Sequence, residues 1–217
     1  MVSAIVFDFD GTLIDASQAI CHSFNGALRQ RRYAEWPEDS IRRMIGRPLT
    51  EMFTEATGCT EAEEIDSLIE AYREHFLPAC VPGSRALPGT VDVIEHFSPR
   101  IPLAIATSRH SDGAVRILQG LGLMSHFSAI VGLEQVENPK PHPEPVIMAL
   151  QRIEVRPQEA AMVGDTVDDI QAGKEAGALS IGVTSGAFSR QQLEKAGADF
   201  VLERISGLIG LLGGISL

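Results

Sequence analysis

Apolar and polar positions along this chain of 217 residues form two kinds of pattern. Apolar side chains recur at helical spacing in residues 16–28 and 65–76, and no strand pattern occurs between about Asp15 and about Pro82. Proline and glycine interrupt this block at Trp36-Pro37 and again at Gly46-Arg47-Pro48. The pattern therefore predicts an all-helical block over residues 15–82.

Short, β-rich apolar runs alternate with helical patterns in the rest of the chain. Pro82-Gly83 and Leu87-Pro88-Gly89 are turn sequences that mark where this alternation resumes. The predicted strands are residues 5–7, 102–106, 129–131, 161–163, 180–183 and 200–202, and the predicted helices are 90–97, 112–121, 144–152, 170–176, 190–195 and a last one within 205–217.

Strands that alternate with helices of this length build a parallel sheet covered on both faces. The sequence thus predicts an α/β protein with a doubly wound, Rossmann-like parallel sheet core. The core comprises residues 1–14 and 83–217, and an α-helical cap domain, residues 15–82, is inserted after the first strand.

Two aspartates end the first strand abruptly, because Asp8 and Asp10 follow the apolar run and precede Gly11. We expect them at the carboxyl end of a buried strand, where open α/β sheets bind ligands. Two carboxylates this close repel each other unless a cation or hydrogen bonds compensate. Mg²⁺ prefers oxygen ligands and is a suitable cation.

Polar side chains also follow three other apolar segments. They are Thr107-Ser108-Arg109, then Lys140 between two prolines, then Asp165 and Asp169 in Gly-Asp-Thr-Val-Asp-Asp. Carboxyl ends of neighbouring parallel strands converge on one crevice, so these residues can meet Asp8 and Asp10. Together they supply a nucleophile, an acid/base, cation ligands and donors to phosphate oxygens, which is what phosphoryl transfer needs.

Composition narrows the range of partners. A net charge of −11 without a basic block argues against nucleic acid. Three cysteines without a CxxC pair are typical of reduced thiols in a cytoplasmic protein, and no signal peptide is apparent at the N-terminus. The weakly polar stretch Ile205–Leu217 is too short for a membrane span and contains glycines, so we expect no membrane partner and a terminal helix packed on the core.

The four motifs, DFDGTL, TSR, a proline-flanked lysine and GDTVDD, resemble in type and order those of the haloacid dehalogenase superfamily. The resemblance is to its magnesium-dependent phosphatase branch with a small α-helical cap, and it extends over nearly the whole chain. Phosphoglycolate phosphatases, pyrophosphatases and β-phosphoglucomutases belong to this branch. The dehalogenases proper lack the second aspartate, so Asp10 argues against that activity.

The resemblance implies a role for each acidic residue. Asp8 is the nucleophile that forms an aspartyl-phosphate, and Asp10 is the general acid and base. Mg²⁺ is bound by the carboxylates of Asp8 and Asp165 and by the backbone carbonyl of Asp10, while Asp169 holds one of its waters. For Asp165 and Asp169 the alternatives are a helix cap and a favourable charge in a first helical turn.

Other residues are implied to bind the substrate. Thr107, Ser108 and Lys140 hydrogen-bond the phosphoryl oxygens, although Thr107 could instead cap the helix that begins near Ser111. Thr12 is expected to support Asp10.

Arg47 lies where related caps carry a substrate-specificity loop, and Arg109 is a similar candidate. For both arginines the alternative is an exposed surface side chain.

The predicted activity is Mg²⁺-dependent hydrolysis of a small phosphorylated metabolite, with 2-phosphoglycolate as the leading substrate, by a monomer or homodimer. Pyrophosphate and a phosphosugar are alternative substrates, and a β-phosphoglucomutase-type isomerase is the alternative reaction. Outside enzymes, two alternatives are a catalytically silent binding module and a phospho-accepting domain of the receiver type. The motif order and the helical insertion argue against the receiver.

Overall fold

The structure is a computed structural model that describes residues 2–186 and 188–214. The chain forms two compact units, one of Met1–Asp15 with Ala86–Leu217 and one of Ala16–Arg85. The sequence predicts the corresponding boundaries at residues 14/15 and 82/83. None of the described helices is long and apolar enough to cross a membrane.

The α/β unit is built on a six-stranded sheet in the order β5-β4-β1-β6-β7-β8, in which each described pairing is parallel. The strands are β1 (Ala4–Phe7), β4 (Leu103–Ala106), β5 (Ala129–Val131), β6 (Ala160–Gly164), β7 (Leu179–Val183) and β8 (Phe200–Leu202). This confirms the predicted doubly wound α/β fold. From β1 the chain builds first towards β5 and then towards β8, so the topological switch point, where such sheets bind ligands, lies beside β1.

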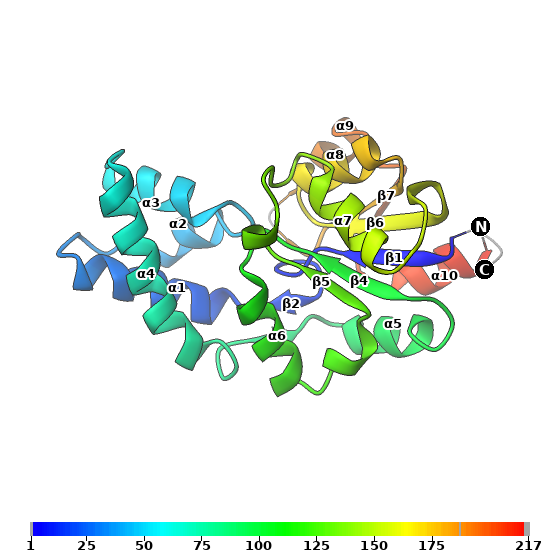
Figure 1. Ribbon diagram of the computed structural model, residues 1–217, viewed down its shortest axis with the longest axis horizontal. Helices are drawn as coiled ribbons and strands as arrows, with labels where there is room; N and C mark the ends of the chain where they lie inside the picture. Colours follow the sequence, from blue (N-terminus) through cyan, green and yellow to red (C-terminus); the bar gives the residue numbers. More distant parts are fainter. Residues whose placement is uncertain (1, 187, 215–217) are drawn as a thin grey trace. The chain divides into compact units, whose positions relative to one another are not determined.

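Helices cover both faces of the sheet (Figure 1). The α/β unit contains α5 (Thr90–Phe97), α6 (Ser111–Gly120), α7 (Glu144–Arg152), α8 (Val167–Ala176), α9 (Arg190–Lys195) and α10 (Gly207–Gly214), with short 3₁₀ helices at Met124–His126, Leu133–Gln135 and Pro157–Glu159. On one face, small strand residues such as Ala104 and Ala160 pack with Ala149 and Ala172, which lets α7 and α8 lie close to the sheet.

The second unit contains the predicted helical block. Its helices are α1 (Ser17–Gln30), α2 (Glu38–Arg42), α3 (Leu49–Thr57) and α4 (Ala62–Ala79), and α2 and α3 begin directly after the prolines of the two predicted breaks. Stacked rings join α1 to α3, because the Phe24 and Phe53 centroids are 4.4 Å apart. Strands β2 (Ile14–Asp15) and β3 (Arg85–Ala86) form a separate two-stranded sheet that the sequence pattern did not predict.

One helix boundary differs from the prediction in an informative way. Helix α8 begins at Val167 rather than at Ile170, because the Thr166 hydroxyl accepts from the Asp169 N–H in a capping box. The predicted last helix is observed as α10 up to Gly214, and its last three residues lie outside the described part of the chain.

Candidate active site

Asp8 directly follows β1, and its N–H donates to the Val163 carbonyl at 2.8 Å, which continues the ladder between β1 and β6. The chain turns at Gly11, where φ is +90°, a conformation that favours glycine. Both Asp8 and Asp10 are buried. The strand and the turn therefore present two carboxylates at the carboxyl end of the central strand, as the sequence predicts.

Lys140 joins three elements at this end of the sheet. Its Nζ donates to Asp8 Oδ1 at 2.6 Å, to Asp169 Oδ1 at 2.5 Å and to the carbonyl of Ala106 at 3.1 Å. Burial works to lower the pKa of Lys140, but the charges of Asp169 and Asp8 outweigh it and raise that pKa above its ordinary value. Lys140 is therefore a positively charged, fixed group beside Asp8.

Asp8, Asp165 and Asp169 form an acidic cluster in which one oxygen of each lies within 4.8 Å of the others. Burial raises the pKa of Asp8 to about 7, with the Lys140 ammonium opposing and Asp169 reinforcing the shift. Burial, together with the charges of Asp8 and Asp169, also raises the pKa of Asp165 well above its ordinary value. Three buried carboxyl oxygens so close together fit a hard, oxygen-preferring cation such as Mg²⁺.

Asp169 is engaged through both of its oxygens. Oδ1 accepts from Lys140, and Oδ2 accepts from the Thr166 N–H at 3.0 Å and from the Thr166 hydroxyl at 2.7 Å. Because both oxygens already accept hydrogen bonds, Asp169 is better suited to orienting neighbouring groups than to binding an ion directly.

Thr12 has a different partner from the one expected. Its buried hydroxyl donates to Asp165 Oδ1 at 2.7 Å, so its single proton is not available to Asp10. The expectation that Thr12 supports Asp10 is therefore wrong. The reversal at Gly11 directs the Thr12 side chain towards β6 instead, where it orients Asp165.

Asp10 is held by Arg109. The Arg109 Nε donates to Asp10 Oδ2 at 2.8 Å and Nη2 donates to Oδ1 at 2.7 Å, a bidentate pair in which the side chains are only 9% and 11% exposed. Arg109 is therefore not an exposed surface arginine, which was the alternative. Its guanidinium carbon also lies 6.0 Å from the centroid of the Phe9 ring.

Thr107 follows β4, and its N–H donates to the Val131 carbonyl at 2.9 Å. Its hydroxyl accepts from the Arg109 N–H at 3.1 Å. Helix α6 begins after His110 without a side-chain cap, so Thr107 is not the cap of that helix. Ser108 is partly buried at the same strand end.

Arg47 belongs to the helical unit, in the connection between α2 and α3. Its side chain is half exposed and its Nη1 lies 3.2 Å from Glu55 Oε2. Its role in specificity stays a prediction.

Two glycines pack against Asp165, and the sequence analysis missed one of them. A Cβ atom on Gly11 would lie 2.6 Å from Asp165 Oδ2, and one on Gly186 would lie 1.7 Å from it. Ser185 links the two segments, because its hydroxyl donates to the Gly11 carbonyl at 2.7 Å. The sequence did contain a clue to Gly186: the segment Thr184-Ser185-Gly186 directly follows β7, the strand that neighbours β6.

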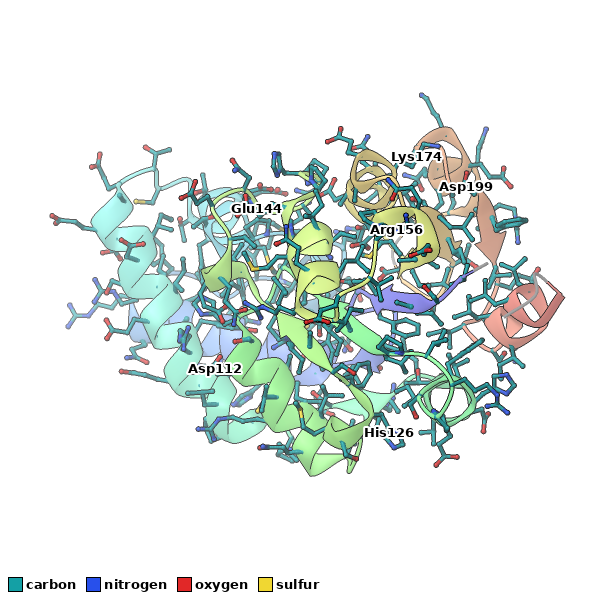
Figure 2. All side chains as sticks on the ribbon, turned by 45° about the vertical axis from the view of Figure 1, so that its right-hand side comes forward. Asp112, His126, Glu144, Arg156, Lys174 and Asp199 are labelled. Atoms are coloured by element: carbon teal, nitrogen blue, oxygen red, sulfur yellow. The ribbon has the colours of Figure 1, made fainter. Side chains whose placement is uncertain are left out.

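The charged groups of this cluster are buried, whereas Lys174 and Asp199 lie at the outer margin of the α/β unit (Figure 2). The sequence profile of the haloacid dehalogenase-like hydrolases matches residues 5–183. The chain belongs to this family.

The relatives of this hydrolase align with almost the entire chain. Probable phosphatase IndB of Dickeya dadantii is 33% identical over 97% of this chain and 93% of its own. Pyrophosphatase PpaX of Anoxybacillus flavithermus is 32% identical over 98% and 97%. The phosphoglycolate phosphatase of Pectobacterium atrosepticum is 28% identical over 98% and 93%.

Solved structures agree with the fold. A haloacid dehalogenase-like family hydrolase from Streptococcus pneumoniae superposes with a TM-score of 0.85 at 25% identity, over 97% of this chain and 98% of that one. The expected membership of the phosphatase branch of the haloacid dehalogenase superfamily is thereby confirmed.

Proposed function

We propose that this hydrolase is a Mg²⁺-dependent phosphatase that acts on a small phosphorylated metabolite through an aspartyl-phosphate on Asp8. One observation carries the proposal. Asp8 lies buried at the carboxyl end of the central strand, 2.6 Å from the Lys140 ammonium and within 4.8 Å of two further acidic side chains. A nucleophile, a fixed cation and a set of oxygen ligands thus meet at one point.

The proposed Mg²⁺ ligands are the carboxylates of Asp8 and Asp165 and the backbone carbonyl of Asp10. When bound, the ion would offset the negative charge that accumulates between these carboxylates and the phosphoryl oxygens. The Asp10 carboxylate is turned to Arg109 and is not in the acidic cluster, which suits a contribution through its carbonyl alone. Asp169, with both oxygens engaged, is assigned to orienting a bound water.

The chain's own residues perform the two chemical steps. The Asp8 carboxylate attacks phosphorus while the bond to the leaving oxygen breaks, and Asp10 gives that oxygen a proton. Asp10 then takes a proton from a water that attacks the aspartyl-phosphate, which releases inorganic phosphate and restores Asp8. Thr107 and Ser108 donate hydrogen bonds to the phosphoryl oxygens as charge develops on them. Lys140 joins them by giving up one of its three present acceptors, Asp8, Asp169 or the Ala106 carbonyl.

We keep 2-phosphoglycolate as the first candidate substrate. Pyrophosphate is the second, favoured by the 32% identity to a pyrophosphatase over nearly all of both chains. A phosphosugar, hydrolysed or isomerised as by a β-phosphoglucomutase, is the third. Arg47 and Arg109 are the residues proposed to select among them.

The test is a screen of phosphorylated metabolites with Mg²⁺, ranked by kcat/KM and containing all three candidates. Asp8→Asn should abolish turnover of each substrate while the protein still folds, as measured by far-ultraviolet circular dichroism. Asp92→Asn, at an exposed position in the first turn of α5, is the matched control and should keep full activity. Near-wild-type turnover by Asp8→Asn would contradict the covalent mechanism.

A further inference from the structure

Lys140 lies in a segment, residues 139–143, in which every second residue is a proline. Because proline has no N–H, this segment cannot join a regular hydrogen-bonded element. Within it, the His142 N–H donates to the Pro139 carbonyl at 3.0 Å, a turn that is local to the segment. The Nζ of Lys140 nevertheless reaches three acceptors at 2.5 to 3.1 Å. Such close contacts require a support for the loop that its own backbone does not supply.

Glu144 supplies that support with both of its carboxylate oxygens. Oε1 accepts from the Glu137 N–H at 2.8 Å, and Oε2 accepts from the Asn138 N–H at 3.0 Å and from Asn138 Nδ2 at 2.9 Å. Hydrogen bonds from the Glu137 backbone and from the Asn138 side chain hold the pKa of the Glu144 carboxyl below its usual value, so the group is ionised. The carboxylate thus holds the two residues that directly precede the proline-rich segment.

The base of this contact is rigid. Glu144 is the first residue of α7, where Figure 2 labels it, and Val146 and Ala149 of the same helix are completely buried in the core against the sheet. A negative charge in a first helical turn is favourable in itself. However, α7 has no side-chain cap, and the Glu144 oxygens bind the loop instead. Glu144 therefore fixes the loop relative to a helix of the core.

We propose that Glu144 is a positioning residue for the phosphoryl transfer, and that its carboxylate holds residues 137–141 in the conformation that places Lys140 Nζ between Asp8 and Asp169. Glu144 acts through Lys140 and is not part of the acidic cluster. The chemical consequence rests on the proposed function, in which Lys140 binds the phosphoryl group. A shift of Lys140 by about 1 Å could cost about 100-fold in rate.

The first test locates Lys140 without measuring activity. The chain has three lysines, and the Lys140 side chain is only 3% exposed, whereas Lys174 and Lys195 are exposed. Acetylation of the folded protein with N-hydroxysuccinimidyl acetate, followed by mass spectrometry, should modify Lys140 much more slowly than the other two. In Glu144→Ala this protection should be lost, while the other lysines keep their rates. Glu137→Gln removes an exposed charge from the same loop and is the matched control, in which Lys140 should stay protected.

The second test measures kcat on 2-phosphoglycolate, pyrophosphate and 4-nitrophenyl phosphate. Glu144→Ala should lower kcat about 10-fold to 100-fold. The factor should be the same on each compound that the wild type hydrolyses, because Lys140 is proposed to bind the phosphoryl group that all three share. Glu144→Gln has one carbonyl oxygen for two backbone N–H groups, so its loss should be smaller and in the same direction. Glu137→Gln should keep the wild-type rate.

Unchanged protection of Lys140 in Glu144→Ala would overturn the inference. So would full activity of this variant below its melting temperature, because Glu144 would then serve stability alone, or a loss confined to one substrate. If Glu144→Ala does not fold, Glu144→Gln decides by the same two measurements. A wild-type enzyme that is inactive on all phosphate esters would contradict the proposed function, whereas acetylation would still decide whether Glu144 positions Lys140.

Discussion

Gly186 lies so close to Asp165 that a side chain cannot be accommodated between them, since a Cβ atom would be 1.7 Å from Asp165 Oδ2. Gly186 is exposed and follows β7, whereas Asp165 is buried and follows β6. The segment after β7 therefore closes over one side of the proposed metal ligand. The neighbouring Ser185 hydroxyl donates to the Gly11 carbonyl, and a Cβ atom on Gly11 would likewise lie close to Asp165 Oδ2, at 2.6 Å.

We predict that Gly186→Ala weakens Mg²⁺ activation by about 10-fold or more, because a displaced Asp165 binds the ion poorly and losses of this size follow from disturbing groups around a metal. The measurement is the Mg²⁺ concentration needed for half-maximal activity. Gly210→Ala is the control, since a Cβ atom at Gly210 in α10 meets nothing within 4 Å. Unchanged Mg²⁺ activation in Gly186→Ala would contradict the role given to Asp165.

Thr12→Val tests the role of Asp165 through the buried hydroxyl that binds it. The substitution keeps the shape of the side chain and removes the hydroxyl that donates to Asp165 Oδ1 at 2.7 Å. We expect Mg²⁺ affinity to fall about 10-fold to 100-fold, as for other groups that orient metal ligands. Thr12→Ser keeps the hydroxyl and should stay near the wild-type affinity. If Thr12→Val changes substrate affinity and leaves Mg²⁺ affinity intact, the Thr12 hydroxyl acts on a group other than Asp165.

The sequence predicted the residues that directly end strands. Asp8, Thr107 and Asp165 each follow a buried run, and parallel strands align such positions at one edge of a sheet, here through registers such as Phe7 with Ile105 and Phe7 with Val163. Their meeting point follows from topology alone. This argument from strand ends does not apply to Lys140, because Lys140 lies in a loop. Only the resemblance to the family assigned Lys140 to the site.

Contacts that depend on side-chain direction in a turn were not predictable. Thr12 reaches Asp165, 153 positions further along the chain, because the chain reverses at Gly11, and a motif does not encode that direction. Arg109 and Asp10 are likewise 99 positions apart. Strands β2 and β3 have two residues each, which is too short for any apolar periodicity.

Replacing Lys140 should destabilise the protein as well as inactivate it. Lys140→Met keeps the length of the side chain but leaves Asp8 and Asp169 buried without their shared cation. Removal of one partner from a buried ion pair costs about 3–5 kcal/mol of unfolding free energy. Denaturant unfolding without metal measures this, with Lys174→Met on the exposed side of α8 as the control. A stability equal to wild type would contradict the stabilising role given to Lys140.

The proton occupancy of Asp8 should make both stability and Mg²⁺ binding depend on pH. Burial raises its pKa from 3.8 to about 7, so between these values the folded chain holds a proton that the unfolded chain has lost. The resulting stabilisation is complete below the unfolded pKa and is lost as the pH rises through the folded pKa. Asp165, whose pKa burial also raises, contributes with the same sign. Without Mg²⁺, the contribution of Asp8 to the melting temperature should therefore fall between about pH 4 and about pH 7.

Mg²⁺ binding should show the opposite trend, because a carboxylate ligand must be ionised and the ion displaces its proton. We predict that affinity rises by up to about tenfold per pH unit below about pH 7 for each proton displaced, and levels off above the pKa of Asp8. Calorimetric titrations in buffers of different ionisation enthalpy would count the protons released. Asp8→Asn removes one titrating group, so its affinity should be lower and its pH dependence shallower by about one proton. An affinity that is constant over this range, with no proton release, would show that both carboxyl groups are already ionised before the ion arrives.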